Sequence, residues 1–298
     1  MSSLLVHFAQ GVLDAVNPST LLRFVASSSR IQTLIAQCLV LNLCVFLGSI
    51  LVYHNLLAPL LAALAPQAVL NILMSLFQTI WLYPAYCVSY LANCMWYDEL
   101  GRLAHRAAAA ESSSSKSNST SKQPPIKPRS WDAAVAQELY KLILLGVYFI
   151  QVFLVNLIAP EKYMIKGILN HILLSWAYAF YCFDYRWSCE SLELPRRVEA
   201  IETRWAYFLG FGTPSVLSAY AISSDALVGA ALCSALYPLF VVAAAAADVP
   251  SHGNDTTNNT ATRRLPIFTF ADAHAARCCT LLCRALLGPS TTASRRRR

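Results

Sequence analysis

The feature that most constrains this chain is a series of long apolar stretches without charged side chains. The longest, Ile31–Leu64, contains no Asp, Glu, Lys or Arg. A helix needs about 20 predominantly apolar residues to cross a bilayer, and this stretch is longer than that. Charged residues make up only 13% of the chain, against about 25% in a typical soluble domain. Because the stretches lack the alternation of barrel strands, we predict an all-α, polytopic membrane protein.

The alternation of apolar and polar stretches divides the chain into five regions. We expect an amphipathic surface segment (1–30), a pair of membrane helices (31–97), a cytosolic low-complexity linker (98–138), a second membrane part of four segments (139–247) and a cytosolic polar, basic tail (248–298). This makes about six membrane segments. The segments at 167–183 and 207–222 are short, so full or partial crossing stays open for both. Pro59, Pro84 and Pro238 predict kinks.

Lys and Arg are distributed unevenly over the expected connections. The N-terminal stretch, the linker, residues 184–204 and the tail together hold 20 of them, whereas the other three loops hold 2. Cytosolic loops carry the excess of positive charge in membrane proteins, so we predict that both termini are cytosolic. The three glycosylation sequons, at Asn118, Asn254 and Asn258, then lie in the cytosol and should carry no glycan.

No pattern in the chain indicates catalysis or cofactor binding. Phosphate-binding loops, nucleophile elbows and HExxH helices are absent, and the Gly210-Phe-Gly212 pair lacks the third glycine of a dinucleotide fingerprint. We therefore expect a protein that is not an enzyme, with no cofactor and no metal. The net charge of +7 comes from residues at segment ends, which fits membrane topology better than nucleic-acid binding. The expected partner is the lipid bilayer.

The most distinctive stretch runs from Asp184 to Pro214. Its periodicity predicts an interfacial helix near 195–205, with Leu194, Val198 and Ile201 on an apolar face and Arg196, Arg197, Glu199 and Glu202 facing away. The candidate site residues are Asp184, Arg186, Trp187, Glu202, Arg204, Trp205, Gly210 and Gly212. They form either a cytosolic interaction surface or the mouth of an anion path, in which Arg186 and Arg204 would bind the anion. The plainer interpretation is charge pairing and close helix packing at the membrane boundary.

Several stretches resemble the etoposide-induced protein 2.4 family, which is related more distantly to the bacterial sulfate permeases called CysZ. They are Trp96-Tyr97-Asp98-Glu99-Leu100, Tyr181-Cys182-Phe183-Asp184-Tyr185-Arg186-Trp187 and Ile201-Glu202-Thr203-Arg204-Trp205, followed by Phe208, Gly210, Phe211, Gly212 and Pro214. The resemblance covers about residues 70–105 and 135–247.

This resemblance implies a multi-pass protein of the endoplasmic reticulum membrane. It implies a role in autophagy and in growth control or apoptosis, with no catalytic residues to carry over. A sulfate-like anion permease is the alternative, because the bacterial relatives are permeases. The resemblance names no protein partner, and a homo-oligomer stays open.

Overall fold

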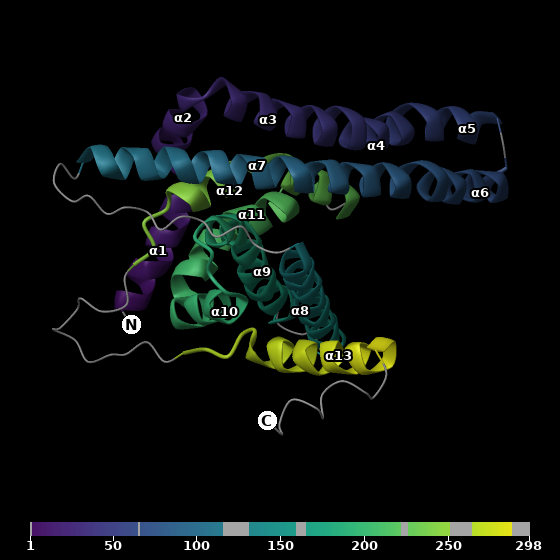
Figure 1. Cartoon of the computed structure of the whole chain (residues 1–298). Helices are drawn as coiled ribbons and strands as arrows, with labels where there is room; N and C mark the ends of the chain where they lie inside the picture. Colours follow the sequence, from purple (N-terminus) through teal and green to yellow (C-terminus); the bar gives the residue numbers. More distant parts are fainter. Residues whose placement is uncertain are drawn as a thin grey trace.

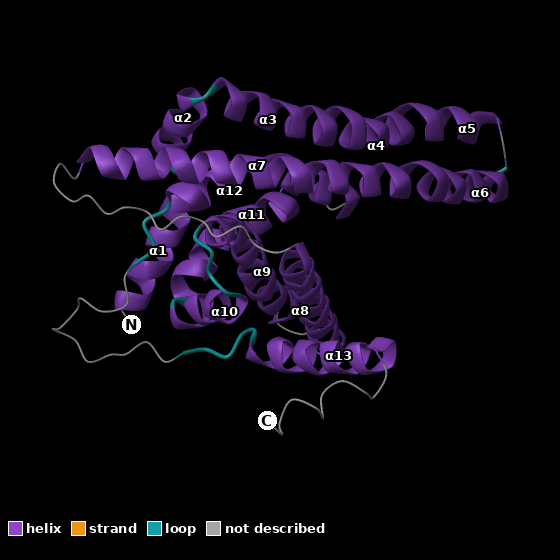
Figure 2. Ribbon diagram, in the orientation of Figure 1, coloured by secondary structure: helices purple, strands orange, loops and turns teal. Residues whose placement is uncertain are grey.

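The structure is a computed structural model that describes residues 2–64, 66–115, 131–158, 165–221, 226–250 and 264–287. Every regular element within these ranges is a helix (Figure 2). The all-α prediction is therefore confirmed for the described residues.

Two long helical rods lie side by side and form a hairpin (Figure 1). The first rod consists of α3 (Ser29–Leu39), η1 (Val40–Leu47), α4 (Gly48–Val52), η2 (Tyr53–Leu57) and α5 (Ala58–Leu64). The second consists of α6 (Gln67–Phe77), η3 (Gln78–Leu82) and α7 (Tyr83–Ser115). Two polar pairs join the rods. Arg30 donates to both carboxylate oxygens of Glu99, at 2.8 and 2.9 Å, and Asn42 and Asn93 exchange amide hydrogen bonds of 3.3 and 3.0 Å.

Three segments of these rods are π-helical: η1, η2 and η3. Two of them end directly before a proline-containing turn, since Pro59 is the second residue of α5 and Pro84 the second residue of α7. Proline has no N–H, and its ring crowds the carbonyl four residues earlier. A π turn is a common way for a helix to absorb such a disturbance. The sequence predicted kinks at both prolines, and the structure has a π segment before each.

The polar linker predicted from residue 98 begins later than expected. Helix α7 continues through Asp98 to Ser115, and α8 already begins at Trp131. Leu100 and Ala104 are buried in a cluster with Phe24 of α2 (Pro18–Ser27), so this part of α7 has an apolar face to pack. The prediction of a linker over 98–138 is therefore wrong for 98–115 and 131–138. Residues 116–130, which carry most of the low-complexity sequence, lie outside the described residues.

The second half of the chain forms a bundle around α9. It comprises α8 (Trp131–Ile158), α9 (Ile165–Cys189), α10 (Leu194–Thr203), α11 (Trp205–Ala221) and α12 (Ala226–Ala246). Helix α9 contacts α7, α8, α10, α11 and α12. The core between them is aromatic, with Phe180, Phe183, Trp187, Phe208 and Phe211 all buried. Helix α9 does not end at Phe183 as predicted, because Asp184 to Trp187 form part of its last turns.

The two ends of the chain also pack on this bundle. Helix α1 (Ser2–Val16) lies against α11, and α13 (Thr269–Leu287) lies against α8 (Figure 1). Ala15 near the end of α1, and Phe268, Ala271 and Ala275 at the start of α13, belong to the main core. This corrects the expectation of a polar tail separate from the membrane part, because residues 264–287 supply core side chains. The location of α1 on a membrane surface stays a prediction.

By length and composition, one helix among the described residues is suited to crossing a membrane: the stretch Ser29–Ala63. Three further apolar stretches are shorter, namely Ala68–Trp81, Leu142–Ile158 and Ala231–Ala246. The first predicted membrane segment, 31–64, coincides with the long stretch. The count of six membrane segments is not confirmed.

Candidate functional site

The stretch from Asp184 to Pro214, here called the platform, joins the end of α9 to α10 and the start of α11. Asp184 is buried near the end of α9, where it accepts a hydrogen bond from Nη1 of Arg197 on α10. Arg197 also donates to Ser188 Oγ at 3.1 Å and to the carbonyl oxygen of Leu192 at 2.8 Å. A buried charge is tolerated when a counter-charge and further hydrogen bonds replace water. The pair therefore fixes α10 against α9.

Arg186 binds the end of another helix. Its Nη1 donates to the carbonyl oxygens of Ala244 and Ala247, at 3.3 and 2.6 Å, and its Nε donates to Glu190 at 2.9 Å. Ala244 lies in the last turn of α12, whose final carbonyls have no partner within the helix. A cation there also complements the negative end of the helix dipole. Arg186 thus caps α12, and its guanidinium is already engaged.

The two platform tryptophans take part in packing. Trp187 is buried, with its ring centroid 6.0 Å from Phe180, 5.7 Å from Phe183 and 5.8 Å from Phe208. Trp205 begins α11, and its carbonyl oxygen accepts a hydrogen bond of 3.0 Å from Nε1 of Trp176 on α9. Such edge-to-face and tilted aromatic contacts stabilise a core beyond the area they bury. Both residues therefore hold α9 and α11 together.

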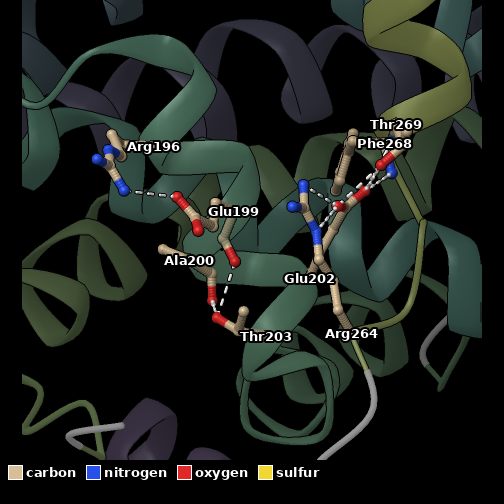
Figure 3. A network of polar contacts seen from close by, with 8 residues as sticks. All are labelled: Arg196, Glu199, Ala200, Glu202, Thr203, Arg264, Phe268 and Thr269. Atoms are coloured by element: carbon tan, nitrogen blue, oxygen red, sulfur yellow. Dashed lines mark hydrogen bonds and ion pairs between the residues drawn. The ribbon is translucent and has the colours of Figure 1, made fainter.

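Glu202 binds three residues of the C-terminal segment (Figure 3). Its side chain is fully buried, yet it accepts hydrogen bonds from the backbone N–H groups of Phe268 and Thr269, at 2.9 and 2.8 Å. Thr269 Oγ1 lies 2.8 and 2.9 Å from its two oxygens, and Arg264 Nε donates at 2.8 Å. The first N–H groups of a helix need an acceptor. Glu202 supplies it for α13 and so binds the C-terminal segment to α10.

The predicted faces of α10 are correct in part. Leu194, Val198 and Ile201 are buried as expected. Arg196 and Glu199 face outward and pair with each other at 3.0 Å (Figure 3). The outward placement of Arg197 and Glu202 is wrong, because they are 1% and 0% exposed. Arg197 is bound by the end of α9 and Glu202 by the C-terminal segment, and a helical period reveals neither contact.

Arg204 connects α10 to α11 and differs from the other charged residues of the platform. Burial lowers the pKa of its guanidinium. Its buried Nε has no hydrogen-bond partner among the described residues. Arg204 thus keeps an unused donor in a buried position, whereas Nε and Nη1 of Arg186 are both engaged.

Gly210 and Gly212 are positions of close helix approach. A Cβ at Gly210 would overlap the carbonyl oxygen of Phe8 in α1, and a Cβ at Gly212 would overlap the carbonyl oxygen of Ser175 in α9. Gly11 of α1 meets the carbonyl oxygen of Tyr207 in the same way. Small residues allow helix backbones to approach closely. The glycine pair therefore fixes α11 between α1 and α9, in agreement with the predicted packing role.

Three groups of residues were missed by the sequence interpretation. Arg197 and Arg264 are the counter-charges of Asp184 and Glu202. The Asn42–Asn93 contact joins the two rods of the hairpin to each other. Asn156 Nδ2 donates to Asn170 Oδ1 at 2.9 Å and so links α8 to α9. Polar residues inside apolar runs were the available signal, because such residues seek partners across helices. Within the described ranges, no cluster of His, Cys, Asp and Glu has an arrangement that could hold a metal ion.

Together, these contacts connect the platform to the helices that surround it. Asp184, Arg186 and Glu202 each bind another helix or the C-terminal segment, and the glycines bring α1 and α9 against α11. The outer surface is formed by exposed residues of α10 such as Pro195 and Arg196. These features can hold helices α1, α9, α10, α11, α12 and α13 in a fixed relation and present α10 on the surface.

The sequence profile described as "Sulfate transporter CysZ/Etoposide-induced protein 2.4" matches residues 18–246. A protein of Arabidopsis thaliana named "Protein EI24 homolog" is 28% identical over 271 residues, covering 80% of this chain and 82% of its own length. A Dictyostelium discoideum protein of the same name is 26% identical, covering 78% and 71%.

A more local similarity links the chain to "Ectopic P granules protein 4" of Caenorhabditis elegans, which is 35% identical over 79 residues, or 26% of this chain and 25% of the relative. No solved structure matches the chain significantly. The profile match extends over most of the chain and includes the whole platform. The chain therefore belongs to the family that comprises etoposide-induced protein 2.4 and the sulfate transporter CysZ.

Proposed function

We propose that this chain is a non-enzymatic, multi-pass protein of the endoplasmic reticulum membrane that supports autophagy, with growth control and apoptosis as further roles. The observation that carries the proposal is family membership over residues 18–246. The long apolar hairpin supports the membrane location, because the stretch Ser29–Ala63 is suited to crossing a bilayer. Both termini are assigned to the cytosol on the distribution of Lys and Arg.

Within this proposal, the platform presents α10 to cytosolic protein partners. Asp184, Arg186 and Glu202 all form their hydrogen bonds inside the molecule. Asp184 and Glu202 attach α10 to α9 and to the C-terminal segment, and Arg186 attaches α9 to the end of α12. The Arg196–Glu199 pair faces outward, with side chains 70% and 43% exposed. It is therefore available to contact a protein partner. Rim charges of this kind contribute to association rate and specificity more than to fold stability.

The test is a rescue experiment in cells that lack the protein. Tagged wild-type chain should locate to the endoplasmic reticulum and restore autophagic flux. The charge-reversed variant Arg196→Glu with Glu199→Lys keeps a pair on α10 but changes its pattern, so we expect normal location and reduced flux. A matched control is Arg102→Glu with Asp98→Lys, which reverses another exposed pair on α7. Location outside the endoplasmic reticulum, or unchanged flux after deletion, would contradict the proposal.

A second function, anion permeation, is favoured by one observation. Arg204 is half-buried with an unpartnered Nε, and a guanidinium with free donors can bind sulfate-like oxyanions. Purified protein in liposomes should then pass sulfate, and Arg204→Ala should reduce the flux without unfolding the chain. Absence of sulfate flux in the wild type would discard permeation and leave the first proposal untouched.

A further inference from the structure

Helix α1 has three faces with different surroundings. Phe8, Gly11 and Ala15 point to α11, where Gly11 meets the Tyr207 backbone and Phe8 meets Gly210. The amphipathic segment expected from the sequence has a single apolar face that includes Leu5, Phe8, Leu13 and Val16. The structure instead divides them, because Leu5, Val6, Leu13 and Val16 lie on a second, outward face. Helix α1 also precedes residue 18, where the match to the family begins, so family membership says nothing about it.

The outward face of α1 is apolar and exposed. Leu5, Val6, Leu13 and Val16 are 67%, 62%, 64% and 45% exposed, and Ala9 between them is exposed as well. At about 100° per residue, these five positions fall on one side of the helix. Leu157 and Ile158 at the end of α8, in one of the shorter apolar stretches, have comparable exposure of 71% and 79%. A continuous apolar strip of this kind requires an apolar neighbour.

Four polar residues of α1 are collected on the third face. These are Ser3, His7, Gln10 and Asp14, spaced three or four apart. Gln10 Nε2 donates to the carbonyl oxygen of Asp248 at 3.2 Å, and Asp14 accepts a hydrogen bond of 2.8 Å from the Tyr207 hydroxyl. The single charge of the helix is therefore held away from the outward strip.

Within the described residues, the strip stays uncovered. The longer segments outside the described ranges, 116–130, 251–263 and 288–298, are rich in Ser, Thr, Asn, Lys or Arg and contain no apolar run. A protein partner is also a poor fit, because binding hot spots are enriched in Trp, Tyr and Arg, and the strip has only aliphatic side chains. Lipid acyl chains match such a strip without any polar contact.

The direction of α1 agrees with a lipid contact along the membrane plane. Helix α1 runs across the direction of the long hairpin rather than along it (Figure 1). If the hairpin crosses the bilayer, α1 is then inclined toward the membrane plane. Its 15 residues span about 22 Å, which is less than the roughly 30 Å hydrocarbon core, so α1 cannot cross on its own.

We propose that the outward strip of α1 is buried among the acyl chains of one leaflet, and that this helix fixes the α1–α11 pair at the membrane boundary. The inference rests on the membrane location proposed above. Interfacial helices usually carry Lys and Arg that attract anionic lipids. Helix α1 has neither, so the contact depends on acyl chains and is indifferent to headgroup charge.

The test uses the full chain with benzoylphenylalanine, a photo-crosslinking residue, at one position at a time. The protein is reconstituted in vesicles of phosphatidylcholine that contain an alkyne-tagged phosphatidylcholine. Leu5 and Leu13 are the probe positions. Ser3 is the matched control, because it is exposed, two residues from Leu5 and on the opposite side of the helix. Val52, exposed on the hairpin, is the reference for lipid contact. Hydrogen exchange of the α1 amides verifies docking in each variant.

We expect lipid adducts at Leu5 and Leu13 close to the yield at Val52 and several-fold above that at Ser3. Added phosphatidylserine should leave these yields unchanged. Equal yields at Ser3 and Leu5 would overturn the inference, as would crosslinks that join two copies of the chain. Labelling at Val52 without labelling at Leu5 and Leu13 would overturn the α1 inference alone. Loss of labelling at Val52 would instead contradict the membrane location proposed for the whole chain.

Discussion

At the scale of single residues, the platform is organised by buried charges with complete sets of partners. Asp184 and Arg197 are almost fully buried, and Arg197 makes two further hydrogen bonds around the ion pair. Glu202 similarly accepts hydrogen bonds from three residues of the C-terminal segment. Removing one member of such a set leaves the other charge buried without compensation, which costs far more than losing an exposed ion pair.

The Asp184–Arg197 pair gives a direct test of this principle. Asp184→Ala should destabilise the protein by about 3–5 kcal/mol, because the Arg197 guanidinium stays buried without its counter-charge. Arg196→Ala on the same helix removes only an exposed pair and should cost about 0–1 kcal/mol. Thermal unfolding of the purified protein in detergent compares the two variants. Equal unfolding midpoints would show that Asp184 does not anchor α10.

At the scale of helices, backbone proximity and caps determine how the elements pack. Periodicity alone identified α10 and its apolar residues Leu194, Val198 and Ile201, because a helix period reports one face. It missed Arg197 and Glu202, since each is covered by a segment whose contact depends on tertiary structure. It also missed the extension of α7 to Ser115, where Leu100 and Ala104 stand among charged residues and are buried by packing against α2, α3 and α12.

Gly212 tests the close approach of α11 to α9. Gly212→Ala should destabilise the fold by about 1–3 kcal/mol, because the added methyl group overlaps the Ser175 carbonyl and the backbones must separate. Gly146→Ala on α8 is the matched control. Nothing lies within 4 Å of its added Cβ, so better helix propensity should leave it neutral or about 0.5–1 kcal/mol more stable. The same unfolding assay distinguishes them, and a neutral Gly212→Ala would rule out the packing role.

Glu202 tests how the C-terminal helix is attached. Glu202→Ala removes the acceptor of the Phe268 and Thr269 N–H groups and the counter-charge of Arg264. We expect the first turns of α13 to exchange backbone hydrogens faster, measured by mass spectrometry on peptides covering residues 264–280. The cost is about 1–3 kcal/mol for each buried group left unsatisfied. Glu199→Ala, one turn earlier and exposed, should leave that exchange unchanged; equal exchange in both variants would refute the clamp.

At the scale of the whole molecule, composition was sufficient for the fold class and insufficient for the number of crossings. Uncharged runs reveal helices that tolerate lipid, and the stretch 31–64 was located correctly. Among the shorter apolar stretches, Ala231–Ala246 combines apolar composition with burial inside the bundle, whereas Leu142–Ile158 has exposed residues such as Leu157 and Ile158. Core helices and membrane helices share that composition, so length and hydropathy cannot distinguish them. The joining of both chain ends to the bundle depended on contacts from Glu202, Gly210 and Tyr207 that no local pattern contains.

The orientation of the molecule can be tested through its three sequons. Asn118 follows the end of α7, which carries Arg102 and Arg106, and Asn254 and Asn258 lie between α12 and Arg264. Positively charged segments stay on the cytosolic side during insertion, so these asparagines should escape glycosylation. Deglycosylation should therefore not change the mass of the wild-type chain. The control is a sequon-bearing insertion between Pro66 and Gln67, in the uncharged connection of the two rods. This insertion should acquire a glycan, whereas a glycan on any native sequon would reverse the proposed topology.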